Sequence, residues 1–87
     1  MAYFSITYQL NDQKNYPKLW DEFDKLGAVK VQNSQYFLDI NNTTVEIKNH
    51  FGQFIDDDDM LMVVRFTIRP TFTKAKAGTN NWLNARF

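Results

Sequence analysis

The sequence predicts an α+β domain, because apolar residues recur at a spacing of two in some segments and at helical spacing in others. Short polar turns separate these segments. The chain has 87 residues, among them eight Phe, four Tyr and two Trp. This length suits one domain, and the aromatic rings would supply much of its small core because each ring buries a large area.

The first predicted strand covers residues 3–8, where apolar and polar side chains alternate and which runs directly into Gln9. This period of two places Phe4, Ile6 and Tyr8 on one face, which we expect to lie toward the core. A polar connector over residues 11–15 follows the strand.

A helix is predicted to begin at Pro17, since a proline in the first turn lacks only an N–H that would have had no helical partner. Gly27 is expected to end this helix as a C-cap. The apolar stripe of the helix consists of Leu19, Trp20, Phe23 and Leu26.

Two further strands are predicted over residues 28–32 and 36–40, joined as a hairpin by the turn at residues 33–35. A second helix then begins at a capping box, in which Thr43 and Glu46 would each bond the other's backbone N–H. Its buried stripe is expected to comprise Ile47, Phe51, Phe54 and Ile55.

The last predicted strand covers residues 60–69 and is closed by Pro70. It begins with apolar residues on both faces and alternates from Val64 onward, which would place Arg65, Thr67 and Arg69 on one face.

The order strand-helix-strand-strand-helix-strand predicts a ferredoxin-like βαββαβ fold, a four-stranded antiparallel sheet with both helices on one face. Residues 1–69 would form this domain and residues 70–87 a C-terminal extension. The face without helices would suit dimerisation or binding. By alternation, this open face is expected to carry Tyr3, Ser5, Thr7, Arg65 and Thr67.

The element order, Tyr8-Gln9 at the end of the first strand, and Gln32, Ser34 and Tyr36 in the hairpin resemble the Cas-two-like proteins of CRISPR systems. That superfamily includes the VapD and SinR-like proteins. The resemblance covers roughly residues 3–68 and implies a homodimer in which sheet faces pack together. It also implies that the segment after the fourth strand reaches the partner. Members act as metal-dependent nucleases or as non-catalytic DNA-binding scaffolds.

The metal-binding aspartate of that superfamily falls on Gln9, whose neutral amide is a poor ligand for Mg²⁺ compared with a carboxylate. We therefore expect no catalytic residues, no metal site and no cofactor, although residual metal-dependent nuclease activity stays open as a weaker alternative. Asp12 could replace the missing carboxylate only if the connector folded back.

Charge divides the chain into an acidic and a basic part. Residues 1–59 hold five basic and ten acidic side chains, a net charge of −5, whereas residues 60–87 hold five basic side chains and no acid. A nucleic-acid-binding stripe is predicted at Arg65, Arg69, Lys74 and Lys76, which would contact phosphates without reading sequence. Alternatively, the basic part covers acidic residues of its own chain or of a partner, with Arg65 paired to Asp39 or another acid.

The C-terminal extension carries apolar side chains that a free tail would not ordinarily expose. We expect Phe72, Trp82 and Leu83 to dock on the domain or across a dimer, after a turn at residues 78–81. His50 is expected at the surface or core boundary, and Asp56–Asp59 in a solvated turn, because neither has the companions of a metal site.

The chain has no cysteine, no signal-peptide pattern and no run of ~20 apolar residues, so we expect a cytoplasmic protein without a membrane partner. The functional expectation is a non-catalytic, homodimeric, CRISPR-associated protein of the Cas-two-like type that binds nucleic acid. The alternative is a protein-interaction module of phage or mobile-element type that acts on a host protein.

Overall fold

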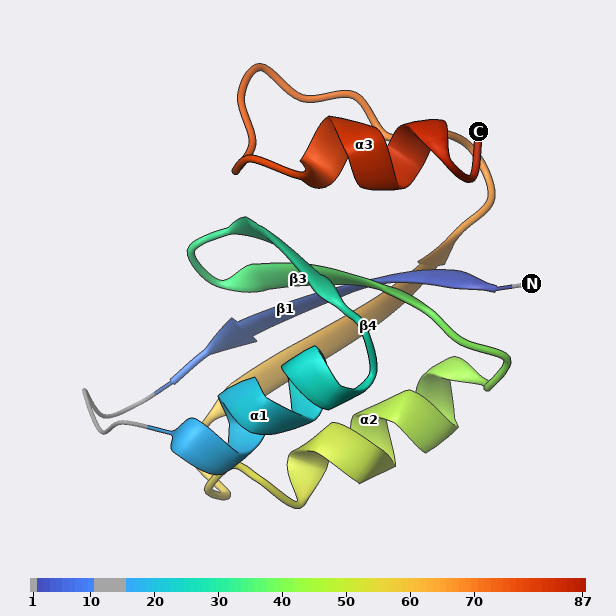
Figure 1. The fold of residues 1–87 in the computed structure, drawn as a ribbon. Coiled ribbons are helices and arrows are strands. Elements are labelled where there is room, and N and C mark those ends of the chain that lie inside the picture. Colours follow the sequence, from blue (N-terminus) through green and yellow to red (C-terminus); the bar gives the residue numbers. More distant parts are fainter. Residues whose placement is uncertain (1, 11–15) are drawn as a thin grey trace.

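The computed structural model describes residues 2–10 and 16–87. Through residue 66, the strands and helices follow the predicted order (Figure 1). In chain order they are β1 (Tyr3–Gln9), α1 (Pro17–Lys25), β2 (Val29–Gln32), β3 (Gln35–Asp39), α2 (Thr44–Gly52), β4 (Met60–Phe66) and α3 (Thr79–Asn84). The predicted α+β class is thereby confirmed.

The four strands form one antiparallel sheet in the order β2-β3-β1-β4, so that β1 is central and β2 and β4 are the edge strands. Helices α1 and α2 lie on one face of this sheet, and α3 lies on the other (Figure 1). The predicted ferredoxin-like arrangement is confirmed, with a C-terminal helix added to it.

Helix α1 begins and ends where the sequence predicts. Pro17 is its first residue, and Gly27 adopts a φ of 74°, a left-handed conformation that glycine reaches without steric cost. The N–H groups of Gly27 and Ala28 donate to the carbonyls of Asp24 (3.1 Å) and Phe23 (3.0 Å). These two bonds form a Schellman motif, which pairs carbonyls that the helix end would otherwise leave open.

The capping box of α2 is also present. The N–H of Glu46 donates to Thr43 Oγ1 at 3.1 Å, and the N–H of Thr43 donates to Glu46 Oε1 at 2.8 Å. Two backbone donors of the helix start are therefore satisfied by side chains, as the spacing predicts.

The main core lies between the sheet and helices α1 and α2. Phe23 of α1 stacks on Tyr36 of β3 at a ring-centroid distance of 4.0 Å and on Phe51 of α2 at 4.4 Å. Stacked rings of this kind join both helices to the sheet. The fully or largely buried members of this core include Phe4, Ile6, Tyr8, Leu19, Phe23, Tyr36, Leu38, Ile47 and Phe51.

The register of β4 corrects one prediction. Tyr3, Ser5 and Thr7 of β1 lie opposite Phe66, Val64 and Met62, so these apolar residues share the face turned away from α1 and α2. Arg65 lies opposite Phe4, on the other face. Tyr3, Ser5 and Thr7 therefore lie on the predicted face, but the placement of Arg65 on that face was wrong, and Thr67 lies beyond the end of β4. The first half of β4 is apolar on both faces, and alternation alone could not fix which side faces the helices.

Two boundaries at the C-terminal end also differ from the prediction. Strand β4 ends at Phe66 rather than Arg69. The predicted turn at residues 78–81 is instead the start of α3, where Gly78 is the N-cap with a φ of 96° and its carbonyl accepts the N–H of Trp82 at 3.0 Å. This six-residue helix is too short to be stable alone, so contacts with the sheet, rather than local sequence, determine it.

Candidate functional site

Helix α3 rests on the sheet face opposite α1 and α2. Leu83 of α3 is completely buried against Val31 of β2 and Phe37 of β3. Trp82 packs on the same cluster, with its ring 5.6 Å from that of Phe37. The C-terminal extension thus packs on the sheet of the same chain and forms a second, smaller core with it. Phe72 lies outside this cluster and is 36% exposed.

The end of the chain is fixed by Arg86. Its Nε donates to Asp39 Oδ2 at 2.8 Å, its Nη1 donates to the carbonyl of Trp82 at 3.0 Å, and its guanidinium lies 3.9 Å from the Trp82 ring centroid. Asp39 is therefore paired with Arg86, rather than with Arg65 as one alternative from the sequence had it.

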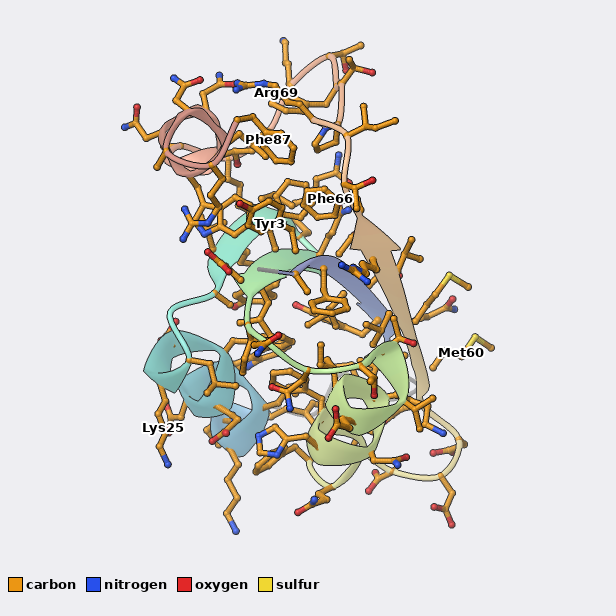
Figure 2. All side chains as sticks on the ribbon, turned by 90° about the vertical axis from the view of Figure 1, so that its right-hand side faces the viewer. Tyr3, Lys25, Met60, Phe66, Arg69 and Phe87 are labelled. Atoms are coloured by element: carbon orange, nitrogen blue, oxygen red, sulfur yellow. The ribbon has the colours of Figure 1, made fainter. Side chains whose placement is uncertain are left out.

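An aromatic cluster completes this layer. Phe87 lies 5.3 Å from Tyr3 and 6.2 Å from Phe66, measured between ring centroids. Figure 2 shows Arg69, Phe87, Phe66 and Tyr3 one below another, from the C-terminal layer down to the sheet. Arg69 is held there by a bond from its Nη1 to Asn84 Oδ1 at 2.9 Å.

The segment from residue 67 to residue 78 carries most of the predicted basic stripe. It leaves the edge strand β4 and reaches the opposite edge strand β2, where the N–H of Lys76 donates to the carbonyl of Val31 at 2.9 Å. The carbonyl of Lys76 accepts from both the N–H (3.2 Å) and the Oγ1 (2.8 Å) of Thr79. These three bonds fix the backbone at Lys76 while its side chain is exposed.

Lys74 and Lys76 lie together on a shallow pocket of about 260 Å³ that also has Gln32 and Asn33 in its lining. Arg69 lies beside the last residue of α3. Arg65 lies on β4, at the opposite edge of the sheet from the two lysines. Of the four predicted basic residues, the structure brings Lys74 and Lys76 to one site and separates Arg65 from it.

Gln9 ends β1 opposite Met60 and is exposed. It lines a pocket of about 270 Å³ together with Thr7, Tyr8, Met60, Leu61 and Met62, none of which carries a carboxylate. Residues 2–10 and 16–87 contain no group of three or more His, Asp or Glu side chains placed to hold a metal ion. Asp12, the suggested substitute ligand, lies outside the described residues.

His50 has a partner that the sequence did not indicate. Its Nε2 lies 2.6 Å from Glu22 Oε2, so the pair joins α2 to α1. In the acidic turn, Asp59 Oδ2 accepts from the N–H of Asp56 at 2.8 Å and from the hydroxyl of Tyr16 at 3.0 Å. Both features connect elements of the fold.

One surface was missed by sequence reasoning: a line of apolar side chains on β4. Met60 and Met62 are each 62% exposed and Val64 is 50% exposed. The signal was present, because the strand begins with apolar residues on both faces. We define Met60, Met62 and Val64 as the β4 apolar row.

No family model matches this chain. Among the described residues, no helix has the length and apolar character required to cross a bilayer.

Proposed function

We propose that this protein binds nucleic acid without catalysis, through phosphate contacts made by Lys74 and Lys76, with Arg69 as a flanking contributor. Arg65, at the opposite edge of the sheet, is not part of this site. The observation that carries the proposal is the placement of Lys74 and Lys76 on one shallow pocket beside Gln32 and Asn33. Lysine ammonium groups bind phosphate oxygens, and side-chain amides donate to them as well.

Rigidity supports this role. The backbone of Lys76 is fixed by bonds to Val31 and Thr79, so a phosphate contact there requires little ordering of the main chain. Residues 60–87 hold no acidic side chain that would repel a phosphate backbone. The shallow pocket suits the extended sugar-phosphate backbone of a nucleic acid better than a small ligand, which binds in an enclosed cavity.

Catalysis is not part of the proposal, because Gln9 and its neighbours offer a hard cation no carboxylate. The resemblance to Cas-two-like proteins supports a non-catalytic, CRISPR-associated role of this kind in a homodimer.

The test is binding to labelled duplex and single-stranded DNA and RNA across a salt series, with and without a chelator. The double variant Lys74→Glu/Lys76→Glu should lose most of its affinity, with a salt slope smaller by about one to two units because up to two phosphate contacts are removed. Lys18→Glu/Lys25→Glu, which makes the same charge change at exposed positions of α1, is the matched control. Equal loss in both variants, or no binding at low salt, would overturn the proposal. Binding should be independent of the chelator.

A protein-interaction module acting on a host protein is the second candidate. It is favoured by the β4 apolar row, since exposed apolar residues that lie together mark interaction surfaces. Absence of nucleic-acid binding at every salt concentration would turn the search to this candidate.

A further inference from the structure

The two edges of the sheet differ. At the β2 edge, the carbonyl of Val31 is bonded by the N–H of Lys76 from the C-terminal segment. At the β4 edge, none of residues 2–10 and 16–87 forms a second ladder beside the one with β1. Alternate residues of Met60–Phe66 therefore direct their backbone N–H and C=O groups toward the open edge.

Edge strands of soluble folds are usually protected by lysine, proline, bulges or charged side chains, because an open edge pairs readily with another strand. The exposed residues of β4 are Met60, Met62, Val64 and Arg65, so that three of the four are apolar. Figure 2 shows the Met60 side chain projecting away from the rest of the molecule. Both the backbone edge and the apolar row are features of a strand that receives a partner.

We infer that the outer edge of β4 is an interface between two copies of this chain, in which the two β4 strands pair antiparallel about a two-fold axis at Val63. The inference does not depend on nucleic-acid binding. It also differs from the face-to-face packing that the resemblance implies, because α3 covers part of that face in this chain.

The geometry of the strand fixes the register. In an antiparallel pair of strands, directly opposed residues lie on the same face of the sheet. The two-fold axis of a symmetric pair must therefore pass through a residue position and not between two residues. An axis at Val63 pairs all seven residues of β4. It sets Met62 opposite Val64 of the second copy, and Met60 opposite Phe66 of the second copy. The apolar row of one chain would thus pack side by side with that of the other on the same face of a continuous sheet.

Charge around the strand supports a second copy of this chain as the occupant. Asp56–Asp59 precede β4, whereas Arg65 and Arg69 lie at and beyond its end. Antiparallel pairing brings the acidic end of one copy beside the basic end of the other, at both ends of the interface. Parallel pairing would place like charges together, which is unfavourable.

The test uses sedimentation of the purified full chain, without nucleic acid, from micromolar to millimolar concentration. The unsubstituted protein should be a dimer, and Met62→Glu should raise the dimer dissociation constant by about tenfold or more, because a carboxylate would be placed against an apolar neighbour. The fold should tolerate this change, since Met62 is 62% exposed, and circular dichroism checks it. Val45→Glu on α2, where Val45 is 59% exposed, is the matched control.

The register has its own test. Adding Val64→Lys to Met62→Glu should restore the dimer, since the introduced carboxylate of each copy would face the introduced ammonium group of the other. Because the chain has no cysteine, Met62→Cys and Val64→Cys variants can also be mixed and oxidised, and the mixed disulfide should predominate over either symmetric one. A monomer at every concentration, a dimer insensitive to Met62→Glu, equal weakening by Val45→Glu, or predominance of a symmetric disulfide would overturn the inference.

Discussion

Arg86 and Asp39 form the ion pair that joins the end of the chain to the third strand, 47 positions away in sequence, at an Nε–Oδ2 distance of 2.8 Å. The side chains are 24% and 11% exposed, respectively. The other carboxylate oxygen of Asp39 is buried without a hydrogen-bond partner among the described residues. Arg86 therefore compensates a carboxylate that would otherwise be poorly solvated, which makes the pair more consequential than an exposed one.

Replacing Arg86 with methionine should lower the free energy of unfolding by about 1–3 kcal/mol, because it leaves the Asp39 carboxylate without its charged donor. Urea unfolding measures this loss. Lys74→Met, which removes an exposed charge from the same layer, should change stability little. Equal effects of the two substitutions would contradict the structural role of the ion pair.

Leu83→Ala should destabilise the whole domain by about 2–5 kcal/mol, since a completely buried leucine is truncated. The unfolding transition, followed by circular dichroism, should shift as a single step because the second core includes residues of β2 and β3. Asn80→Ala, at an exposed position of α3, is the control. If only the signal of Trp82 changed at low denaturant, α3 would be a separate unit rather than part of the domain.

Thr43→Ala should cost about 1 kcal/mol of stability, the usual contribution of a Thr N-cap. Thr44→Ala, one residue into the helix, should have a smaller effect because it leaves the capping box intact. Comparable losses in both variants would argue against the cap bond at Thr43 Oγ1.

The same box predicts a dependence on acid. The hydrogen bond from the Thr43 N–H lowers the pKa of the Glu46 carboxyl. A lowered folded pKa stabilises the protein above the ordinary pKa of Glu, and this contribution is lost as the pH falls through the lower, folded value. Glu46→Gln should therefore show a shallower loss of stability below pH ~4.5 than the unsubstituted protein. Parallel acid profiles for the two proteins would contradict it.

The features that the sequence predicted correctly depend on interactions between residues that are close together in the chain. Pro17, Gly27 and the Thr43–Glu46 box act within a few residues, and each lies where its local pattern placed it. The order of strands and helices followed from the spacing of apolar residues, because in β1 and α1 these residues recur on one face of the element.

The candidate surfaces depended on long-range packing and were harder to predict. The face of β4 was ambiguous because both of its sides begin with apolar residues, and the edge position that tolerates them is visible only in the sheet order. Helix α3 is too short for the helix propensities of its residues to predict it. The hydrogen bond between Lys76 and Val31 brings Lys74 and Lys76 to the β2 edge, and no sequence pattern predicts this bond.

We expect the ionisation of Tyr8 to make the folded protein less stable at alkaline pH. Burial, and in second place the charge of nearby Tyr36, raises the pKa of Tyr8 to about 12. An unfolded tyrosine ionises near pH ~10. Between these values the unfolded chain releases the Tyr8 proton while the folded chain keeps it, so the free energy of unfolding falls as the pH rises.

The expected loss from Tyr8 is about 2–3 kcal/mol at most between pH ~10 and ~12, at about 1.4 kcal/mol for each pH unit. Tyr8→Phe should flatten this part of the profile, although it also removes the hydroxyl bond to the carbonyl of Asn33 at 3.2 Å and so costs about 1 kcal/mol at neutral pH. Some slope should persist in the variant, because burial also raises the pKa of Tyr36. Urea unfolding at a series of pH values separates the two effects, and an unchanged alkaline slope in Tyr8→Phe would show that Tyr8 titrates alike in the folded and unfolded chains.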